Sequence, residues 1–110
     1  MPIKGANGAN LHYLDEGTGT PILFLHGLLW SGEMFRAQID ALKGAHRCVA
    51  LDFRGQGKSE ITRDGYDMET LFADTVALIE SLSLAPCHVV GLLMGGFVAM
   101  RLAARRPDLV

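Results

Sequence analysis

The chain has 110 residues, of which 49% are hydrophobic and 20% are charged, a composition typical of one ordinary globular domain. Ten basic against 12 acidic residues give a formal net charge of −2, and no basic stripe is present that could follow a phosphate backbone. We therefore expect no nucleic-acid partner. No segment approaches the roughly 18 apolar residues of a membrane span, and residues 1–8 lack the apolar run of a signal peptide. These features favour a cytoplasmic protein with no membrane partner.

The cysteines and carboxylates give no sign of a metal or cofactor site. Cys48 and Cys87 each lie inside an apolar run and form no C-x-x-C pair. Because disulfides are rare in reducing compartments, we expect both thiols to be free and to pack as small hydrophobic groups. No paired spacing of histidine or cysteine typical of metal sites occurs either. We therefore expect neither a metal nor a cofactor.

The strands are predicted from apolar and alternating patterns. Residues 10–15 alternate polar and apolar side chains, and Gly5 and Gly8 mark a turn that joins them to a strand at about residues 2–4. This pattern predicts an antiparallel hairpin at the N-terminal end. Three continuous apolar runs then predict strands that are covered on both faces, at residues 21–27, 47–52 and 87–92.

Three helical patterns separate or follow these apolar runs. The first begins after Ser31 as its N-cap and is stopped by Gly44, and the second begins after Asp67 as its N-cap. The third is expected over residues 95–105. Its packing face is predicted to consist of its larger apolar residues together with one alanine, which are Phe97, Met100, Leu102 and Ala104.

Alternation of apolar strands with helices predicts the fold class α/β, with a mostly parallel sheet of about five strands, an N-terminal hairpin and three helices. We expect one α/β domain over residues 1–110. Parallel strands of such a sheet end at one common edge, where ligands bind. The loops at residues 26–28, 52–55 and 92–95 should therefore converge there.

A glycine-rich segment at residues 55–59 raises phosphate-binding alternatives. Gly57-Lys58-Ser59 matches the end of a Walker A loop, but Asp52 stands where the first glycine is required, and no helix follows directly. A dinucleotide fingerprint fails similarly, because the third glycine and its helix are missing. We interpret Gly55 and Gly57 as turn residues.

The segment from Val89 to Gly96 carries the most specific pattern. Gly91 and Gly95 have the spacing of the G-x-S-x-G nucleophile elbow, and Leu93 stands where the nucleophile is expected. His26-Gly27 follows a buried strand, and residues 52–59 read D-x-R-G-x-G-x-S. With these motifs in order, essentially the whole chain resembles the α/β-hydrolase superfamily, in particular its esterases and enol-lactonases.

This resemblance implies a fold and a set of site residues. The chain corresponds to the N-terminal half of an α/β hydrolase without a lid, ending before the acid and the histidine that the family carries later in its chain. The parent activity is carboxylic-ester or lactone hydrolysis. The backbone N–H groups of Leu28 and Met94 form the oxyanion hole. Five further residues support the elbow and the oxyanion loop, namely His26, Gly27, Gly91, Gly95 and Gly96.

Catalysis by this chain alone is not expected. Leucine has no lone pair with which to attack a carbonyl, so Leu93 is a non-functional nucleophile position, and we expect it to plug the end of a buried strand. No histidine follows it in the sequence. His12, His46 and His88 are expected to be structural or solvated, away from the site. His26 is expected to support the loop rather than to transfer protons.

Two other functions stay open at this stage. The chain is alternatively a non-catalytic binding or assembly module, with Leu28, Phe53, Leu93 and Met94 forming an apolar pocket for a small ester-like molecule. It is otherwise one segment of a split hydrolase whose partner supplies the missing groups. The strand at residues 87–92 would have a bare outer edge, which favours a homo-oligomer or a complementary fragment.

Overall fold

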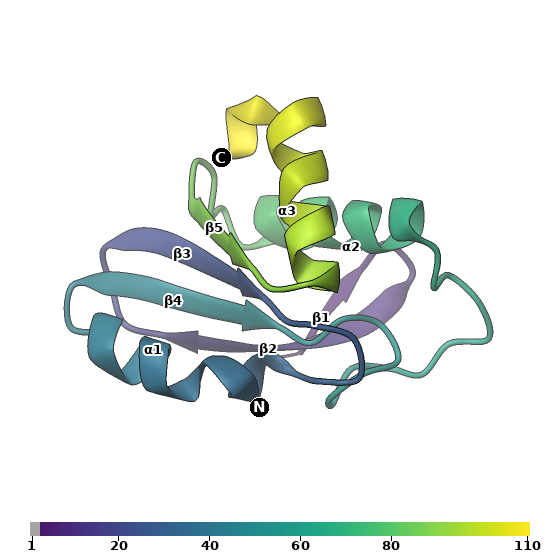
Figure 1. Cartoon of the computed structure of the whole chain (residues 1–110), viewed down its shortest axis with the longest axis horizontal. Helices are drawn as coiled ribbons and strands as arrows, with labels where there is room; N and C mark the ends of the chain where they lie inside the picture. Colours follow the sequence, from purple (N-terminus) through teal and green to yellow (C-terminus); the bar gives the residue numbers. More distant parts are fainter. Residues whose placement is uncertain (1–2) are drawn as a thin grey trace.

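A mixed five-stranded sheet with strand order β1-β2-β4-β3-β5 runs through the molecule (Figure 1). The computed structural model describes residues 3–110. β1 pairs antiparallel with β2 and β2 with β4, whereas β3 pairs parallel with both β4 and β5. The predicted α/β class, hairpin and neighbouring parallel strands are confirmed. The strands are β1 (Ile3–Ala6), β2 (Ala9–Glu16), β3 (Thr20–Leu25), β4 (His46–Leu51) and β5 (His88–Gly91).

The N-terminal hairpin turns later in the chain than the sequence predicted. Asn7 and Gly8 form the turn, both with positive φ (50° and 81°), which suits a two-residue turn between twisted strands. Gly5 instead belongs to β1. The predicted strand position at Pro2 lies outside the described residues.

The 3-10 helix at Gly32–Phe35 and the helix at Met68–Ser81 begin at the predicted caps Ser31 and Asp67. Ser31 Oγ accepts a hydrogen bond from the Glu33 amide at 3.3 Å, and the Asp67 carboxylate accepts one from the Thr70 amide at 3.2 Å. Such bonds satisfy amides that have no acceptor within the first helical turn. The helices are α1 (Arg36–Leu42), α2 (Met68–Ser81) and α3 (Met94–Arg105), with short 3-10 helices at Gly32–Phe35 and Pro107–Leu109.

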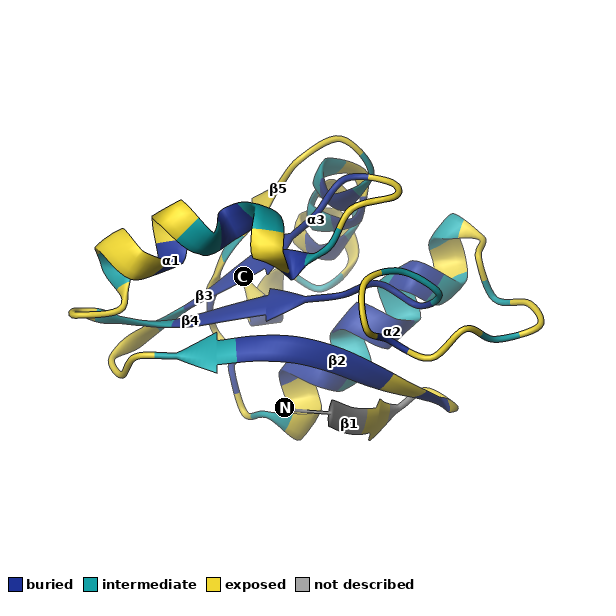
Figure 2. Ribbon diagram, turned by 90° about the horizontal axis from the view of Figure 1, so that it is seen from below, coloured by how far each residue is buried: buried dark blue, intermediate teal, exposed yellow. Residues whose placement is uncertain are grey.

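The helices lie on both faces of the sheet, with α1 on one face and α2 and α3 on the other (Figure 1). In β3, Ile22 and Phe24 pack in the α1 core, whereas Leu23 and Leu25 pack in the α2 and α3 core. Successive side chains of a strand point to opposite faces. The strand is therefore buried on both faces, as its continuous apolar run predicted, and Figure 2 shows β3 and β4 largely buried.

The predicted packing face of α3 is wrong for most of its residues. Phe97 and Met100 are 58% and 62% exposed, and Ala104 is exposed, whereas Val98 and Leu102 are fully buried. Gly95 is also buried and lies against β3. Because the closest helix-to-strand approach occurs at Gly95, that residue determines which face of the helix meets the sheet. The larger side chains of Phe97 and Met100 consequently point outward.

Candidate active site

The loops that follow β3, β4 and β5 meet at one edge of the sheet. Leu25, the last residue of β3, is paired with Leu51 at the end of β4 and with Gly91 at the end of β5. The segments at residues 26–31, 52–59 and 92–93 therefore leave the sheet side by side, as the sequence predicted (Figure 1). The candidate site lies at this edge.

The turn from β5 into α3 has the backbone geometry of a strained elbow. Leu93 is the N-cap of α3 and has φ 52° and ψ −113°. A side chain other than glycine in such a region costs on the order of 1–3 kcal/mol unless the surrounding structure holds it. The turn keeps this conformation although leucine is the central residue.

Close approach of strand and helix holds the elbow in place. A Cβ on Gly91 would lie 2.7 Å from the Gly96 nitrogen, and one on Gly95 would lie 2.8 Å from the His26 oxygen. The Gly95 amide donates to the carbonyl oxygens of His26 and Leu92, at 3.1 and 3.0 Å. A Cβ on Gly96, by contrast, would come no closer than 3.6 Å to another atom. Positions 91 and 95 therefore require glycine, because a Cβ would collide with neighbouring backbone atoms, whereas position 96 has room for a Cβ.

Leu93 does not plug the end of the strand, because its side chain is 69% exposed. It lies beside the loop that follows β3: a Cβ built on Gly27 would be 3.7 Å from both Cβ and Cδ1 of Leu93. The elbow and Gly27 are therefore close neighbours. The sequence prediction of a buried plug fails because the elbow turns its central side chain out of the sheet.

His26 joins the loops that follow β3 and β4. Its Nδ1 lies 2.6 Å from the Gly27 carbonyl oxygen and therefore carries the hydrogen, and its Nε2 accepts the Phe53 amide hydrogen at 2.9 Å. The imidazole ring of His26 and the phenyl ring of Phe53 also pack edge to face, with their centroids 4.8 Å apart. Burial lowers the pKa of His26 below its ordinary value of 6.5, outweighing the bond to Gly27 and the charge of Asp52. Both nitrogens are occupied, which leaves none for a reacting group.

His12 lies closer to the site edge than its place in the hairpin suggested. Its Nδ1 is 2.7 Å from Asp52 Oδ2, and its buried Nε2 has no hydrogen-bond partner among the described residues. The antiparallel pairing of β2 with β4 sets Tyr13, in the middle of β2, opposite Leu51 at the end of β4, which brings the next residue pair, His12 and Asp52, together. This pairing is the signal that could have predicted the contact. His46 is half-buried and His88 is exposed.

Both carboxylate oxygens of Asp52 are engaged in hydrogen bonds that hold the structure together. Oδ1 accepts the Gly32 amide hydrogen at 2.6 Å, and Oδ2 accepts the Lys58 amide hydrogen at 2.9 Å in addition to its contact with His12. The Asp52 side chain is almost completely buried. It fixes the loop after β4 to the start of the segment that leads into α1.

A buried ion pair anchors the long segment between β4 and α2. Arg54 Nε and Nη2 donate to the two oxygens of Asp74 at 3.0 and 2.8 Å, and Nη2 also donates to the Asn7 carbonyl at 2.9 Å. Asn7 Nδ2 donates to Asp74 at 2.9 Å. Three distant parts of the chain are joined by this cluster.

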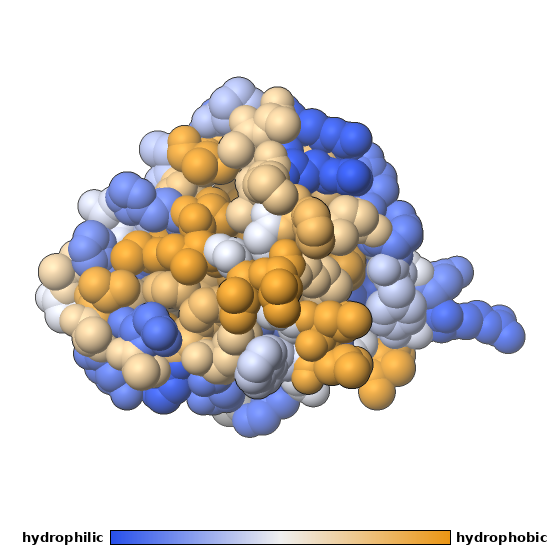
Figure 3. Space-filling view, viewed as in Figure 1, coloured by the Kyte–Doolittle hydropathy of each residue, from blue (hydrophilic) through white to orange (hydrophobic). Residues whose placement is uncertain are grey.

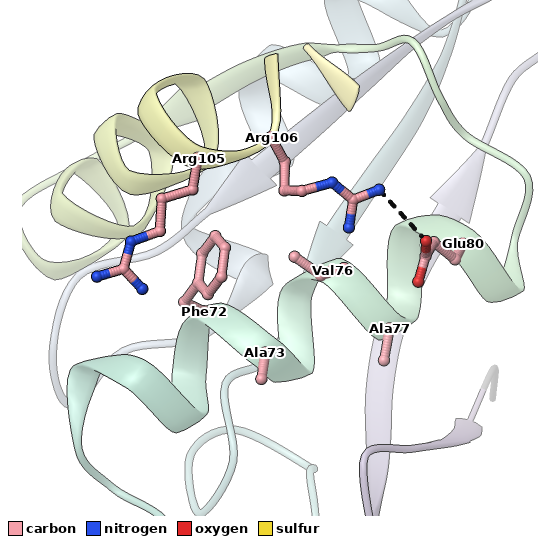
Figure 4. A pocket seen from close by; sticks show the side chains of 7 residues that line it. All are labelled: Phe72, Ala73, Val76, Ala77, Glu80, Arg105 and Arg106. Carbon is pink, nitrogen blue, oxygen red and sulfur yellow. Dashed lines mark hydrogen bonds and ion pairs between the residues drawn. The ribbon is translucent and has the colours of Figure 1, made fainter. Parts of the chain in front are cut away.

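The residues that the sequence assigned to an apolar pocket do not all reach the surface. Phe53 is fully buried and cannot contact a ligand, whereas Leu28 is 61% exposed. A groove of about 300 Å³ lies elsewhere, between α2 and the end of α3, with Phe72 and Val76 on its floor (Figure 4). Arg105 lies beside the Phe72 ring and Arg106 extends toward Glu80 in that view. Both guanidinium groups are engaged in ion pairs.

The described residues offer no metal site and no membrane helix. Among residues 3–110, no group of three or more histidine, cysteine, aspartate or glutamate side chains is placed to hold a metal ion. Within the same range, no helix has both the length and the apolar character needed to cross a bilayer. Cys48 and Cys87 are free and buried, and burial raises the pKa of both thiols.

Hydrophobic residues gather on the face that carries β5 and α3 (Figure 3). Exposed large apolar residues come from the loop after β3, from the end of β5 and the elbow, and from α3. They include Leu28, Leu29, Trp30, Val90, Leu92, Leu93, Phe97 and Met100. β5 is the last strand in the sheet order, so its outer edge has no neighbouring strand among the described residues.

Comparison with known proteins places these features in a family. A family model described as the alpha/beta hydrolase fold matches residues 20–110. A Mycobacterium tuberculosis protein named as a candidate non-heme bromoperoxidase, BpoC, is 43% identical over 103 residues, which are 92% of this chain and 39% of that protein. The soluble epoxide hydrolase of a Corynebacterium species is 36% identical, over 94% of this chain and 36% of its own length.

Solved structures give the same result for the fold. The enol-lactonase of Burkholderia xenovorans superposes with a TM-score of 0.93 at 33% identity, over 99% of this chain and 44% of the enzyme. The chain thus spans about two fifths of the length of these relatives. With the family model matched over most of its length and the strand order, elbow and loops described above, the chain belongs to the α/β-hydrolase family.

Proposed function

We propose that the described residues form the oxyanion-binding half of a hydrolase site and supply no nucleophile. The donors are the backbone N–H groups of Leu28 and Met94. Met94 is the first residue of α3, where an amide has no acceptor within the helix and the helix dipole favours negative charge. Leu28 follows Gly27, which faces Leu93. The observation that carries the proposal is the strained elbow at Leu93, directly before one donor and opposite the loop that carries the other.

Two such donors would stabilise the negative charge that develops on a carbonyl oxygen during acyl transfer. The attacking group is missing, because the Leu93 side chain has no lone pair. His26 cannot act as the general base, since both of its nitrogens are occupied. The 110-residue chain by itself should therefore not turn over esters.

Hydrolysis of p-nitrophenyl acetate tests this proposal. The purified chain should release p-nitrophenol at the uncatalysed rate, and Leu93→Ser should add no turnover above that of Leu93→Ala, because neither acid nor base is supplied. Strong ester turnover by the wild-type chain or by Leu93→Ser would contradict the proposal.

The ligand that this site fits best is a small apolar ester or lactone. The exposed side chains of Leu28 and Leu93 flank the two amide donors with apolar surface. Relatives named as an enol-lactonase and as epoxide hydrolases support a small ligand that carries a polar oxygen. The parent activity is proposed to be ester or lactone hydrolysis.

A non-catalytic binding role is the second candidate, favoured by the same exposed leucines. It predicts that γ-butyrolactone shifts the amide resonances of Leu28 and Met94 in a saturable way without being hydrolysed. An absence of shifts at both amides over a titration to high lactone concentration would count against binding at this site.

A partner at the β5 edge is the third component of the proposal. β5 carries no charged residue or proline that would prevent pairing at its edge, and Val90 within the strand and Leu92 just after it are exposed. A second copy of the chain or a complementary hydrolase fragment would pair there, and such a fragment could supply the acid and histidine of a split enzyme. Sedimentation that gives a clean monomer at tens of micromolar would contradict self-association, and a failure to co-purify with such a fragment would contradict complementation.

A cytoplasmic location belongs to the same proposal. Its support is that both cysteines are free and buried, which is usual in reducing compartments. Cell fractionation with an antibody to the chain would test it, and recovery from the secreted fraction would contradict it.

A further inference from the structure

The segment between β3 and α1 has a strained residue at its centre. Leu29 has φ 62°, in the left-handed region, and its side chain is 86% exposed. An exposed side chain contributes little burial that could hold the backbone in this conformation. Another interaction must therefore hold Leu29, which directly follows the proposed donor Leu28.

Gln56 provides that interaction. Its side-chain Oε1 accepts the Leu29 amide hydrogen at 2.7 Å. The backbone of Gln56 is itself fixed, because its amide donates to the Phe53 carbonyl at 2.9 Å and its carbonyl accepts the Ser59 amide hydrogen at 3.1 Å. The acceptor thus projects from a firm turn in the loop after β4.

Two buried hydrogen bonds join the loop after β4 to the segment between β3 and α1, one before Leu29 and one after it. Nε2 of His26 accepts from Phe53 at 2.9 Å before the strained residue, and the Gly32 amide donates to Asp52 at 2.6 Å after it. Between these anchors, Leu28, Leu29 and Trp30 are exposed at the surface of the molecule. The bond from Leu29 to Gln56 holds the middle of the segment.

We infer that Gln56 is a positioning residue that sets the direction of the Leu28 N–H group by holding Leu29 in its left-handed conformation. The inference rests on the proposed oxyanion role of Leu28. When the acceptor is removed, Leu29 is free to relax toward an ordinary backbone conformation. The peptide group between Leu28 and Leu29 turns with it, and this changes the backbone of Leu28 and the direction of its own N–H group. Anion binding at the two donors then weakens while the fold is kept, because Gln56 is partly exposed.

Amide NMR of the full chain with sodium butyrate as the probe tests this inference. In the wild-type chain, butyrate should shift the Leu28 and Met94 amide resonances in a saturable way. Gln56→Met, which keeps the length of the side chain but removes the acceptor, should speed hydrogen exchange at the Leu29 amide and weaken butyrate binding, each by roughly threefold to tenfold. Gln56→Ala removes the same acceptor and should reproduce both effects.

Two control variants separate positioning from general perturbation. Gln56→Glu retains an acceptor oxygen, so the Leu29 amide should keep its wild-type exchange rate, although the added charge opposes butyrate. Gln38→Met changes an exposed glutamine on α1 and should alter neither measurement.

The outcomes distinguish the inference from the function on which it rests. Wild-type exchange at Leu29 and wild-type butyrate binding in both Gln56→Met and Gln56→Ala would overturn the role of Gln56 alone. If the wild-type chain shows no butyrate shift at Leu28 or Met94, the oxyanion proposal itself fails, and the role of Gln56 fails with it.

Discussion

Gly95 lies directly against the backbone carbonyl group of Leu25, so that a Cβ on the glycine would overlap the main chain of β3. Backbone atoms in the centre of a sheet cannot move aside as a flexible side chain can. We expect Gly95→Ala to lower the free energy of unfolding by about 1–3 kcal/mol, the range for overpacking a rigid site. Urea denaturation followed by circular dichroism measures this change.

Gly96→Ala is the matched control for this prediction. A Cβ at this neighbouring position would come no closer than 3.6 Å to another atom, and the residue lies inside α3. Alanine should therefore raise the free energy of unfolding by about 0.5–1 kcal/mol, since it restricts the unfolded chain. Equal losses in the two variants would show that close approach at Gly95 is not the cause.

Leu93→Gly should stabilise the chain. The substitution removes the strain of about 1–3 kcal/mol at φ 52°, loses little burial, and costs about 0.5–1 kcal/mol because glycine is more flexible when unfolded. A net gain of up to roughly 2.5 kcal/mol is expected from these terms. Leu92→Gly, one residue earlier and without a positive φ, should destabilise. A loss of stability in Leu93→Gly would contradict the assignment of strain.

The stability of the chain should fall in mild acid because of His26. Burial lowers the pKa of its imidazole in the folded state below the ordinary 6.5, so the unfolded chain binds protons more readily. The contribution of neutral His26 to the free energy of unfolding is complete above pH about 6.5, and it is lost as the pH falls from there through the folded-state pKa. Protonation at Nε2 also removes the acceptor of the Phe53 amide. Denaturation midpoints measured from pH 7.5 to 5 should decline accordingly.

Ring NMR identifies the group that causes this decline. The Cε1–H resonance of His26 should titrate below pH 6.5, and His88→Gln, a change at an exposed histidine, should leave the stability curve unaltered. A folded-state titration of His26 above 6.5 would exclude it as the source.

Asp74→Ala should be among the most destabilising substitutions outside the central sheet. It would leave the guanidinium of Arg54, which is 8% exposed, without its charged partner. Breaking a buried pair in this way typically costs about 3–5 kcal/mol. The double variant Arg54→Met/Asp74→Leu should cost less than Asp74→Ala alone, as measured by urea denaturation. A larger loss in the double variant would contradict this account.

The fold could be predicted from the sequence where a local pattern decides the structure. Asp67 and Ser31 have the side chains that cap helices, and both begin one. The apolar run of β3 has no polar face, so the sequence predicted that the strand would be covered on both faces of the sheet. These features depend on neighbouring residues only, so one sequence carries them.

Features that depend on contacts between distant segments could not be predicted in the same way. The outward position of Phe97 follows from the contact of Gly95 with β3, and the pairing of His12 with Asp52 follows from the antiparallel register of β2 and β4. Gln56 occupies an unspecified position of the D-x-R-G-x-G-x-S motif, so the motif gave no indication of its contact with Leu29 in another loop. The family motifs identified the region of the site, but they did not predict these contacts between distant segments.

The sheet order also has a consequence for biosynthesis. β3 pairs with β4 and β5, both of which follow it in the chain, and β5 ends only at Gly91. As the chain leaves the ribosome, the apolar strand at Thr20–Leu25 therefore has neither neighbour at first. It acquires the second one only after the chain has emerged as far as Gly91. During that interval, β3 is the segment on which a chaperone that recognises extended apolar peptides would act.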